Sequence, residues 1–249
     1  MTIRTSELNS QTLPLWKAWL LAFRPKTLTA ALVPILTGAA LVYFQKHTVQ
    51  WWIPILALFA SFFIQIGTNL INDAVDFQKG ADTEARLGPV RVTQRGIFTA
   101  SQVWIMGSLF FVLALLCGIP LVLQGGWPIV MIGVLAILFG YAYTAGPFPL
   151  AYLGLGDLFV ILFFGLVAVG GLVFLMTGAV DLSALVMGLQ IGLLAAVLIA
   201  INNLRDMNQD IQAGKKTWPV RFGARFARLE IAFLTLVPFL LNLYWWYAA

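Results

Sequence analysis

The stretch NLINDAVDFQKGADTEARLGPVR, Asn69–Arg91, decides how this chain is organised. It places four acids close to three bases, namely Asp73, Asp76, Asp82 and Glu84 beside Lys79, Arg86 and Arg91. The segment directly before it, WWIPILALFASFFIQIGT (51–68), has no charged residue. A dense charged cluster at the end of an uncharged segment indicates a helix that leaves the apolar part of a membrane at a functional site.

The composition extends this interpretation to the whole chain. Of 249 residues, 61% are hydrophobic and 10% are charged, whereas soluble domains have about 25% charged residues. In lipid a helix of ~20 apolar residues satisfies its own backbone hydrogen bonds. The sequence therefore predicts an all-α, polytopic transmembrane helical bundle. One cysteine and one histidine exclude an internal disulfide and a histidine-rich metal site.

Seven segments are apolar enough to cross a bilayer, at about 27–44, 51–71, 102–123, 127–144, 152–177, 183–204 and 226–248. With the N-terminus in the cytoplasm, every lysine and arginine except Lys46 lies on the cytoplasmic side, as the positive-inside rule requires. The formal charge of +5 is then explained by the excess of lysine and arginine in cytoplasmic loops, and it does not indicate nucleic-acid binding. We expect one domain, 1–249, in an inner (plasma) membrane, with its chemistry in two cytoplasmic loops, 72–101 and 202–225.

The second loop repeats features of the first. In INNLRDMNQDIQAGKKTWPVRFG (201–223), Asp206 follows Asn202 by four residues, as Asp73 follows Asn69, and Pro-Val-Arg occurs at 89–91 and again at 219–221. Facing carboxylates repel unless cations lie between them, and hard oxygen ligands suit Mg²⁺ with substrate phosphates. Nearby arginines and lysines suit phosphate oxygens. The alternatives are plain ion pairs on wet loops and, as another class of protein, a cation-coupled transporter.

At these residues the sequence resembles the UbiA superfamily of intramembrane prenyltransferases. The superfamily pattern, Asn-Asp-x-x-Asp after helix 2 and Asp-x-x-x-Asp after helix 6, is matched at Asn72-Asp73-x-x-Asp76 and at Asp206–Asp210. Many relatives have another acid where this chain has Gly80, with Asp82 nearby. That departure, with RPKT (24–27), RLGPVR (86–91) and YTAGPFPLAYLGLGD (143–157), is similar to the 1,4-dihydroxy-2-naphthoate prenyltransferase branch. Such relatives commonly have nine helices, so we expect this chain to be short at its C-terminus.

The resemblance implies transfer of a polyprenyl or phytyl chain from its diphosphate to 1,4-dihydroxy-2-naphthoate, with loss of the carboxylate, in menaquinone or phylloquinone synthesis. A different aromatic acceptor, such as 4-hydroxybenzoate, is the alternative within the family. Mg²⁺ is expected on Asp73, Asp76, Asp206 and Asp210, and diphosphate contacts on Asn72, Asn202, Arg86, Arg91, Lys215 and Arg221. The expected partners are the two substrates and the lipid bilayer, with no nucleic acid; the sequence does not indicate whether there is a protein partner.

Two further residues are expected near the reacting carbon atoms. Loss of diphosphate leaves an allylic cation that aromatic faces can shield, and Tyr143 is a candidate for this role, with an ordinary position at the membrane interface as the alternative. Asp157 is an acid in the apolar segment GLGDLFVILFFG (154–165). An acid there needs a partner, so Asp157 either orients the acceptor hydroxyl or pairs with a nearby basic residue.

Overall fold

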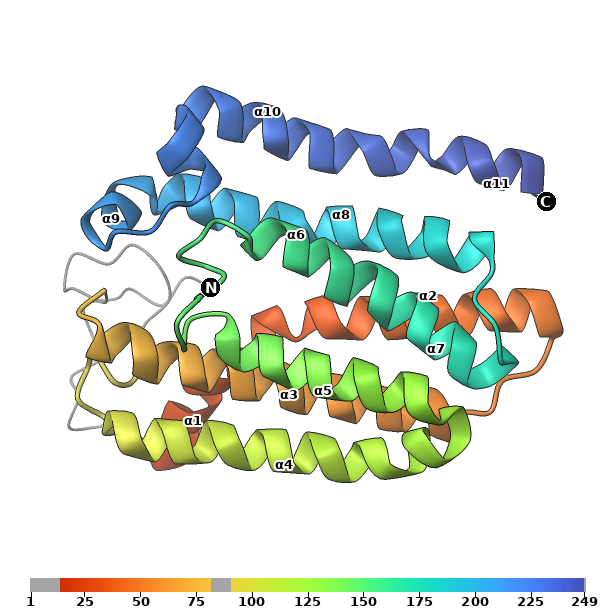
Figure 1. The fold of residues 1–249 in the computed structure, drawn as a ribbon, viewed down its shortest axis with the longest axis horizontal. Coiled ribbons are helices and arrows are strands. Elements are labelled where there is room, and N and C mark those ends of the chain that lie inside the picture. The colour runs from red at the N-terminus through yellow and green to blue at the C-terminus, as the bar shows by residue number, and fades with distance from the viewer. Residues whose placement is uncertain (1–13, 82–90, 249) are drawn as a thin grey trace.

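The computed structural model describes residues 14–81 and 91–248, and these form only helices and their connections. Most helices are long and lie side by side in one bundle (Figure 1). In chain order they are α1 (Leu15–Phe23), η1 (Pro25–Thr27), α2 (Thr29–Lys46), α3 (Trp52–Gln78), α4 (Ala100–Gly125), α5 (Trp127–Ala142), α6 (Gly156–Val160), the π-helix η2 (Ile161–Val167), α7 (Ala168–Thr177), α8 (Leu182–Arg205), α9 (Met207–Gln212), α10 (Trp218–Leu240) and α11 (Asn242–Ala248).

Six membrane-spanning candidates occur in the described part of the chain, taking Gly156–Thr177 and Trp218–Ala248 each as one apolar unit. The seventh expected span, 127–144, is α5, which has 16 residues and a length of about 24 Å. That is less than the ~30 Å hydrocarbon core. The structure therefore corrects the expected seven full spans to six, with α5 as a shorter apolar helix. The integral membrane class predicted from composition is confirmed.

Local sequence signals explain where several helices begin. Thr99 accepts a hydrogen bond from the Gln102 backbone, and the Gln102 side chain returns one to Thr99, which forms a capping box at the start of α4. Asp181 caps α8 by accepting from the Ala184 N–H at 2.8 Å. Proline follows the first residue of both α5 and α10, where its missing N–H costs no helical hydrogen bond.

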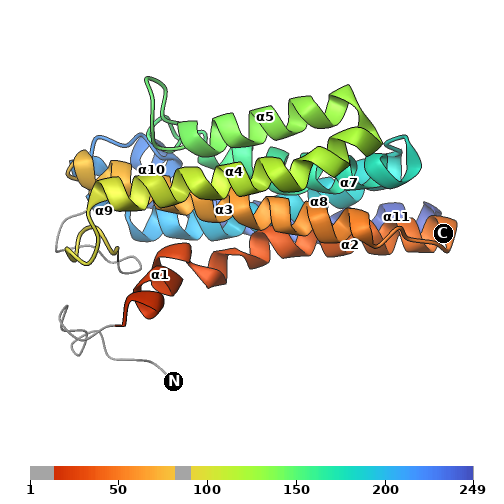
Figure 2. The same ribbon diagram turned by 90° about the horizontal axis from the view of Figure 1, so that it is seen from below.

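The two motif-bearing helices, α3 and α8, end on the same side of the bundle, at the left in Figure 1, next to α9. Helix α3 continues to Gln78, so Asp73 and Asp76 lie in its last turns. Helix α1 projects from the bundle at this end (Figure 2) and packs Ala18 and Ala22 beside Leu70. We call this side the motif end.

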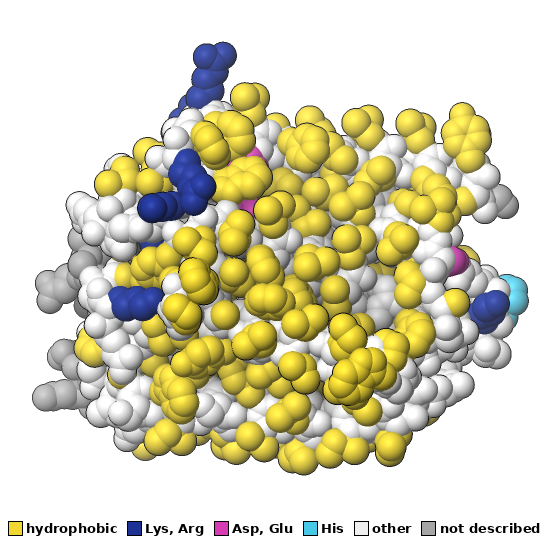
Figure 3. Space-filling view, in the orientation of Figure 1, with side chains coloured by type: hydrophobic (Ala, Val, Ile, Leu, Met, Phe, Trp, Pro, Cys, Tyr) yellow, Lys and Arg dark blue, Asp and Glu magenta, His cyan; other side chains and the backbone are white. Residues whose placement is uncertain are grey.

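Charge is distributed unequally between the two ends. On the face in Figure 3, Lys and Arg side chains gather toward the motif end, and hydrophobic side chains cover the middle. The single histidine, His47, follows Lys46 at the opposite end, where α2 stops. This is the asymmetry that the positive-inside rule predicts, and the cytoplasmic location of the N-terminus stays a prediction.

Helix η2 and helix α8 approach each other through glycine. A Cβ atom added at Gly165 would lie 2.3 Å from the Gly188 carbonyl oxygen and 2.6 Å from the Gly192 Cα. The small-residue pattern at 188 and 192 therefore allows backbone contact between two spans. The π-helical turn around Gly165 also directs Phe163, Phe164 and Val167 toward the central cavity.

Candidate active site

Four polar side chains lie along the last turns of α3, and all four are buried: Asn69, Asn72, Asp73 and Asp76. Asn69 donates to the Thr27 hydroxyl at 3.0 Å, which joins α3 to η1. Asn72 accepts from the Thr144 hydroxyl at 2.6 Å. These bonds satisfy the buried amides and connect α3 to the segment after α5.

The carboxylates of Asp73 and Asp76 contact the chain that returns at 91–93. Asp73 accepts from the Val92 N–H at 3.3 Å and from the Thr93 hydroxyl. Asp76 forms a buried ion pair with Arg91 at 2.9 Å. The first motif thus holds residues 91–93 against the end of α3. Arg91 was expected to contact the diphosphate, and in the structure it pairs with the Asp76 carboxylate.

The second motif divides its two acids between different partners. Asp206 ends α8 and receives two hydrogen bonds of 2.7 Å from Arg205. Asp210 is buried in α9, with the Thr217 hydroxyl at 3.4 Å and the Lys215 ammonium at 3.7 Å. Removal from water raises the pKa of Asp210 above its ordinary value; Lys215 opposes this shift, and the charges of Asp206 and Asp76 add to it.

The two motifs meet through their second acids. Asp76 lies near enough to Asp210 to affect its ionisation, although the two residues are far apart in sequence. Tyr143, just after α5, lies within electrostatic range of Asp76, Asp157 and Asp210. The expectation that two distant acidic clusters converge at one end of the bundle agrees with this arrangement.

Asp157 is 2% exposed and accepts from the Asn203 amide at 3.3 Å through one oxygen. Its other oxygen has no hydrogen-bond partner. Glu230 of α10 is also buried, lies within electrostatic range of Asp157, and has one oxygen without a hydrogen bond. Asp157 is therefore an inward-facing acid with an available oxygen, and its neighbour in the structure is Asn203, not a basic residue.

Two of the expected diphosphate ligands, Asn202 and Arg221, make other contacts or face outward in the structure, and a third lies outside the described residues. Asn202 is exposed on α8, one position before the inward Asn203. Arg221 donates to the carbonyl oxygens of Leu153 and Lys216, each at 2.8 Å, and so fastens a loop. Arg86 lies outside the described residues.

Sequence reasoning missed Lys79 and Tyr152. The Tyr152 hydroxyl donates to Asp76 at 3.0 Å, and its ring lies 4.5 Å from the Lys79 ammonium and 5.1 Å from that of Lys215. Lys79 was visible as a base just after the first motif. Tyr152 belongs to the quoted stretch 143–157, but no spacing rule relates it to either motif.

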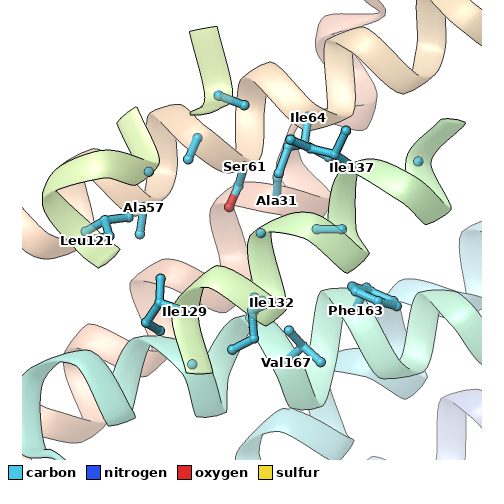
Figure 4. Close-up of a pocket in the computed structure, with 18 of the residues that line it drawn as sticks. Ala31, Ala57, Ser61, Ile64, Leu121, Ile129, Ile132, Ile137, Phe163 and Val167 are labelled. Atoms are coloured by element: carbon cyan, nitrogen blue, oxygen red, sulfur yellow. The ribbon is translucent and has the colours of Figure 1, made fainter. Parts of the chain in front are cut away.

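A large apolar cavity of about 490 Å³ reaches into the bundle from this cluster. It is lined by α2, α3, α4, α5, η2 and α7, and Figure 4 shows Ile129, Ile132, Ile137, Phe163 and Val167 around it. Tyr143 and Phe159 belong to its wall, so the cavity approaches the acids at Tyr143. Three phenylalanines pack together there, with centroids 4.7 Å apart for Phe139–Phe159 and 5.5 Å for Phe139–Phe163.

The donor atoms present suit Mg²⁺ when substrate oxygens complete its shell. In the described residues no three His, Cys, Asp or Glu side chains are close enough to enclose a metal ion by themselves. Mg²⁺ usually takes one or two carboxylates, with waters and substrate phosphates supplying the rest. Asp76 and Asp210 provide such carboxylates. Burial is the main cause of the raised pKa of Asp210, and the charges of Asp206 and Asp76, which a cation would offset, add to it.

Comparison with known proteins agrees with this geometry. The model of the UbiA prenyltransferase family matches residues 31–249. The 1,4-dihydroxy-2-naphthoate octaprenyltransferase of Haemophilus influenzae is 39% identical, over 91% of this chain and 75% of that protein. The enzyme of the same name from Escherichia coli K12 is 37% identical, over 85% of this chain and 70% of that protein.

Solved structures show the same fold at lower identity. A UbiA homologue from Archaeoglobus fulgidus bound to GPP and Mg²⁺ superposes with a TM-score of 0.73 and 19% identity. The match covers 93% of this chain and 78% of that structure.

Proposed function

This chain belongs to the UbiA prenyltransferase family, and we propose that it transfers a polyprenyl group from its diphosphate to 1,4-dihydroxy-2-naphthoate, releasing CO₂. One observation carries the proposal: Tyr143 lines the apolar cavity and also lies beside Asp76, Asp157 and Asp210. A prenyl diphosphate has the matching form, a long apolar tail joined to a highly charged head.

The substrate positions follow from this junction. The tail occupies the apolar cavity between α3, α5 and η2, and the diphosphate lies at the motif end among Asp76, Asp210 and Lys215. Phe139, Phe159 and Phe163 then face the carbon chain near the bond that breaks. Aromatic faces stabilise positive charge without reacting with it, and the apolar wall keeps out water that would capture the allylic cation.

In the reaction the C–O bond to diphosphate breaks, and a C–C bond forms to the ring carbon that bears the carboxylate. The carboxylate then leaves as CO₂, and its bonding electrons return to the aromatic ring. Asp157, held by Asn203, accepts a hydrogen bond from an acceptor hydroxyl and so orients the ring. When bound, Mg²⁺ would offset the negative charge that grows on the departing diphosphate.

We assign the metal to Asp73, Asp76, Asp206 and Asp210. The hydrogen bonds that Asp73 and Asp206 make here do not prevent this role, because each carboxylate oxygen has two acceptor lone pairs. By the same proposal Asn72 and Lys215 contact the donor head, whereas Arg91 and Arg221 maintain the shape of the site. Arg86, outside the described residues, stays an expected diphosphate ligand. We also propose that the site lies on the cytoplasmic side of a bacterial inner membrane, which the positive charge at the motif end supports.

The test is a reconstituted assay in lipid nanodiscs with Mg²⁺, a polyprenyl diphosphate and naphthoate labelled in its carboxyl group. We expect labelled CO₂, diphosphate, and a prenylated product by mass spectrometry, all abolished by EDTA. Asp76→Asn and Asp210→Asn should each lower turnover by at least about a hundredfold.

Asp181→Asn is the matched control, because it makes the same chemical change at the far end of α8 and asparagine also caps helices. It should leave turnover unchanged. Parallel reactions with 4-hydroxybenzoate and with phytyl diphosphate identify the acceptor and the donor. Consumption of 4-hydroxybenzoate alone would contradict the naphthoate assignment, and no release of diphosphate from folded protein would contradict transferase activity altogether.

A further inference from the structure

Tyr152 lies in the connection between α5 and α6, outside both acidic motifs, yet it contacts both of them. Its hydroxyl donates to Asp76 of the first motif at 3.0 Å. Its backbone carbonyl accepts from the Lys216 N–H at 2.8 Å, six residues after Asp210 of the second motif. One residue thus joins two segments that are about 140 positions apart in sequence.

The connection around Tyr152 is firmly attached to the start of α10. The Trp218 indole donates to the Gly154 carbonyl at 2.8 Å, and Arg221 donates to the Leu153 carbonyl at 2.8 Å. Gly154 has φ +72°, and a Cβ atom there would lie 2.3 Å from the Lys216 carbonyl oxygen. Tyr152 is therefore presented from a fixed backbone, which is what a residue that positions others requires.

Two ammonium groups from opposite halves of the chain lie against the Tyr152 ring. The Lys79 ammonium is 4.5 Å from the ring centroid and also donates to the Thr144 carbonyl at 2.7 Å. The Lys215 ammonium is 5.1 Å from the same centroid. Like charges repel. Asp210 lies 3.7 Å from the Lys215 ammonium, so the further anion that this arrangement favours is one that also reaches Lys79.

An aromatic face holds a cation in a different way from a carboxylate. A carboxylate neutralises the ammonium, whereas the ring attracts it through a quadrupole and leaves its charge uncompensated. Arg91 and Arg205 are each paired with an aspartate. Lys79 instead rests on a ring and a carbonyl, which leaves it suited to a polyanion that arrives with the substrate.

We propose that Tyr152 is a positioning residue, which holds Lys79 and Lys215 for the donor diphosphate and fixes the orientation of Asp76. The inference rests on the proposed function, because it takes the anion to be that diphosphate. It adds Lys79 as a diphosphate ligand and assigns different roles to the ring and to the hydroxyl of Tyr152. The ring orders the lysines, and the hydroxyl orders a carboxylate assigned to the metal.

The experiment measures binding of inorganic pyrophosphate with Mg²⁺ to the full chain in nanodiscs by titration calorimetry, with thermal unfolding followed in parallel. Four variants are compared with the original chain: Tyr152→Phe, Tyr152→Leu, Lys79→Gln and the double variant Tyr152→Leu/Lys79→Gln. Tyr43→Phe is the matched control, because Tyr43 is exposed in the last turn of α2, at the end of the bundle opposite the motif end. It should bind pyrophosphate with unchanged affinity.

Tyr152→Phe keeps the ring, so we expect near-normal affinity at saturating Mg²⁺ and about a fivefold higher Mg²⁺ requirement. Tyr152→Leu removes the ring as well and should weaken pyrophosphate binding about tenfold even at saturating Mg²⁺. Lys79→Gln should weaken it to a similar extent. The double variant should lose less affinity than the two single effects added together, because the single variants share the loss of the Tyr152–Lys79 interaction.

The outcomes separate this inference from the proposed function. If Tyr152→Leu binds pyrophosphate as tightly as the original chain, or if its effect and that of Lys79→Gln simply add, the inference is wrong while the transferase assignment stands. If Tyr152→Leu fails to fold, Tyr152→Phe decides, and an unchanged Mg²⁺ requirement overturns the role of the hydroxyl. A folded original chain that binds no pyrophosphate overturns both.

Discussion

Gly165→Ala tests whether the contact between η2 and α8 determines the shape of the cavity. The added methyl group would lie 2.3 Å from the Gly188 carbonyl oxygen, against 3.4–4 Å for ordinary contact. Both neighbouring atoms, that oxygen and the Gly192 Cα, belong to the backbone of a long helix. They cannot rotate away, so the two helices must separate by about 1 Å. Overpacking of this kind costs about 1–3 kcal/mol, and rigid backbone on both sides favours the upper value.

Gly118→Ala is the matched control for this prediction. It makes the same substitution within α4, and a Cβ atom there meets nothing within 4 Å. Because alanine is the better helix former, the control should be neutral or more stable by up to about 1 kcal/mol. The difference between the two variants, about 3 kcal/mol, is measured by unfolding in mixed detergent micelles.

A second measurement connects the contact to function. Phe163 and Val167 belong to η2 and line the cavity, so separation of the helices should raise KM for the prenyl donor more than KM for the acceptor. Gly192→Ala should act alike, because its Cβ atom would lie 2.5 Å from the Ile161 carbonyl oxygen. Equal stability of Gly165→Ala and Gly118→Ala would refute the reasoning.

Three further predictions concern the site. Arg91→Met should destabilise the protein by about 3–5 kcal/mol in thermal unfolding, because it leaves the Asp76 carboxylate buried without its cation. A stable variant that only loses pyrophosphate affinity would show instead that Arg91 is a phosphate ligand. Gly133→Leu, which enters open space at the cavity wall, should impair long donors more than short ones in a donor-length series while stability is kept. Asp157→Asn should fold normally and lower kcat about a hundredfold with little change in the donor KM; an unchanged kcat in steady-state assays would exclude Asp157 from the chemistry.

The membrane class and the placement of most spans could be predicted because the hydropathy of a segment depends only on its own residues. The short α5 could not, because its C-terminal end is set by a turn and not by a loss of apolar character. After Ala142 the chain folds back, with the Leu150 N–H bonded to the Ala142 carbonyl and the Ala151 N–H to that of Tyr143. Residues 143 and 144 therefore belong to the site and not to a span.

The meeting of the two motifs was also predictable, because both lie at the ends of long helices that leave the membrane on the same side. Side-chain partners were not. Asn202 and Asn203 differ by one position, which is about 100° of helix rotation, and only the packing of α8 against α6 determines that Asn203 faces Asp157. Tyr152 lies in a connection whose path depends on the rest of the fold.

The two acids of each motif have different neighbours in the structure. Asp73 accepts from the Val92 N–H and the Thr93 hydroxyl, and Asp206 accepts from Arg205, so both bind partners within their own half of the chain. Asp76 and Asp210, the second acid of each motif, lie close enough for the charge of Asp76 to affect Asp210. Two carboxylates in a poorly solvated place repel, and Arg91 on one side and Lys215 on the other offset this repulsion. We expect a cation that arrives with an anionic substrate to relieve this repulsion, so that the binding of metal and the binding of diphosphate would depend on each other.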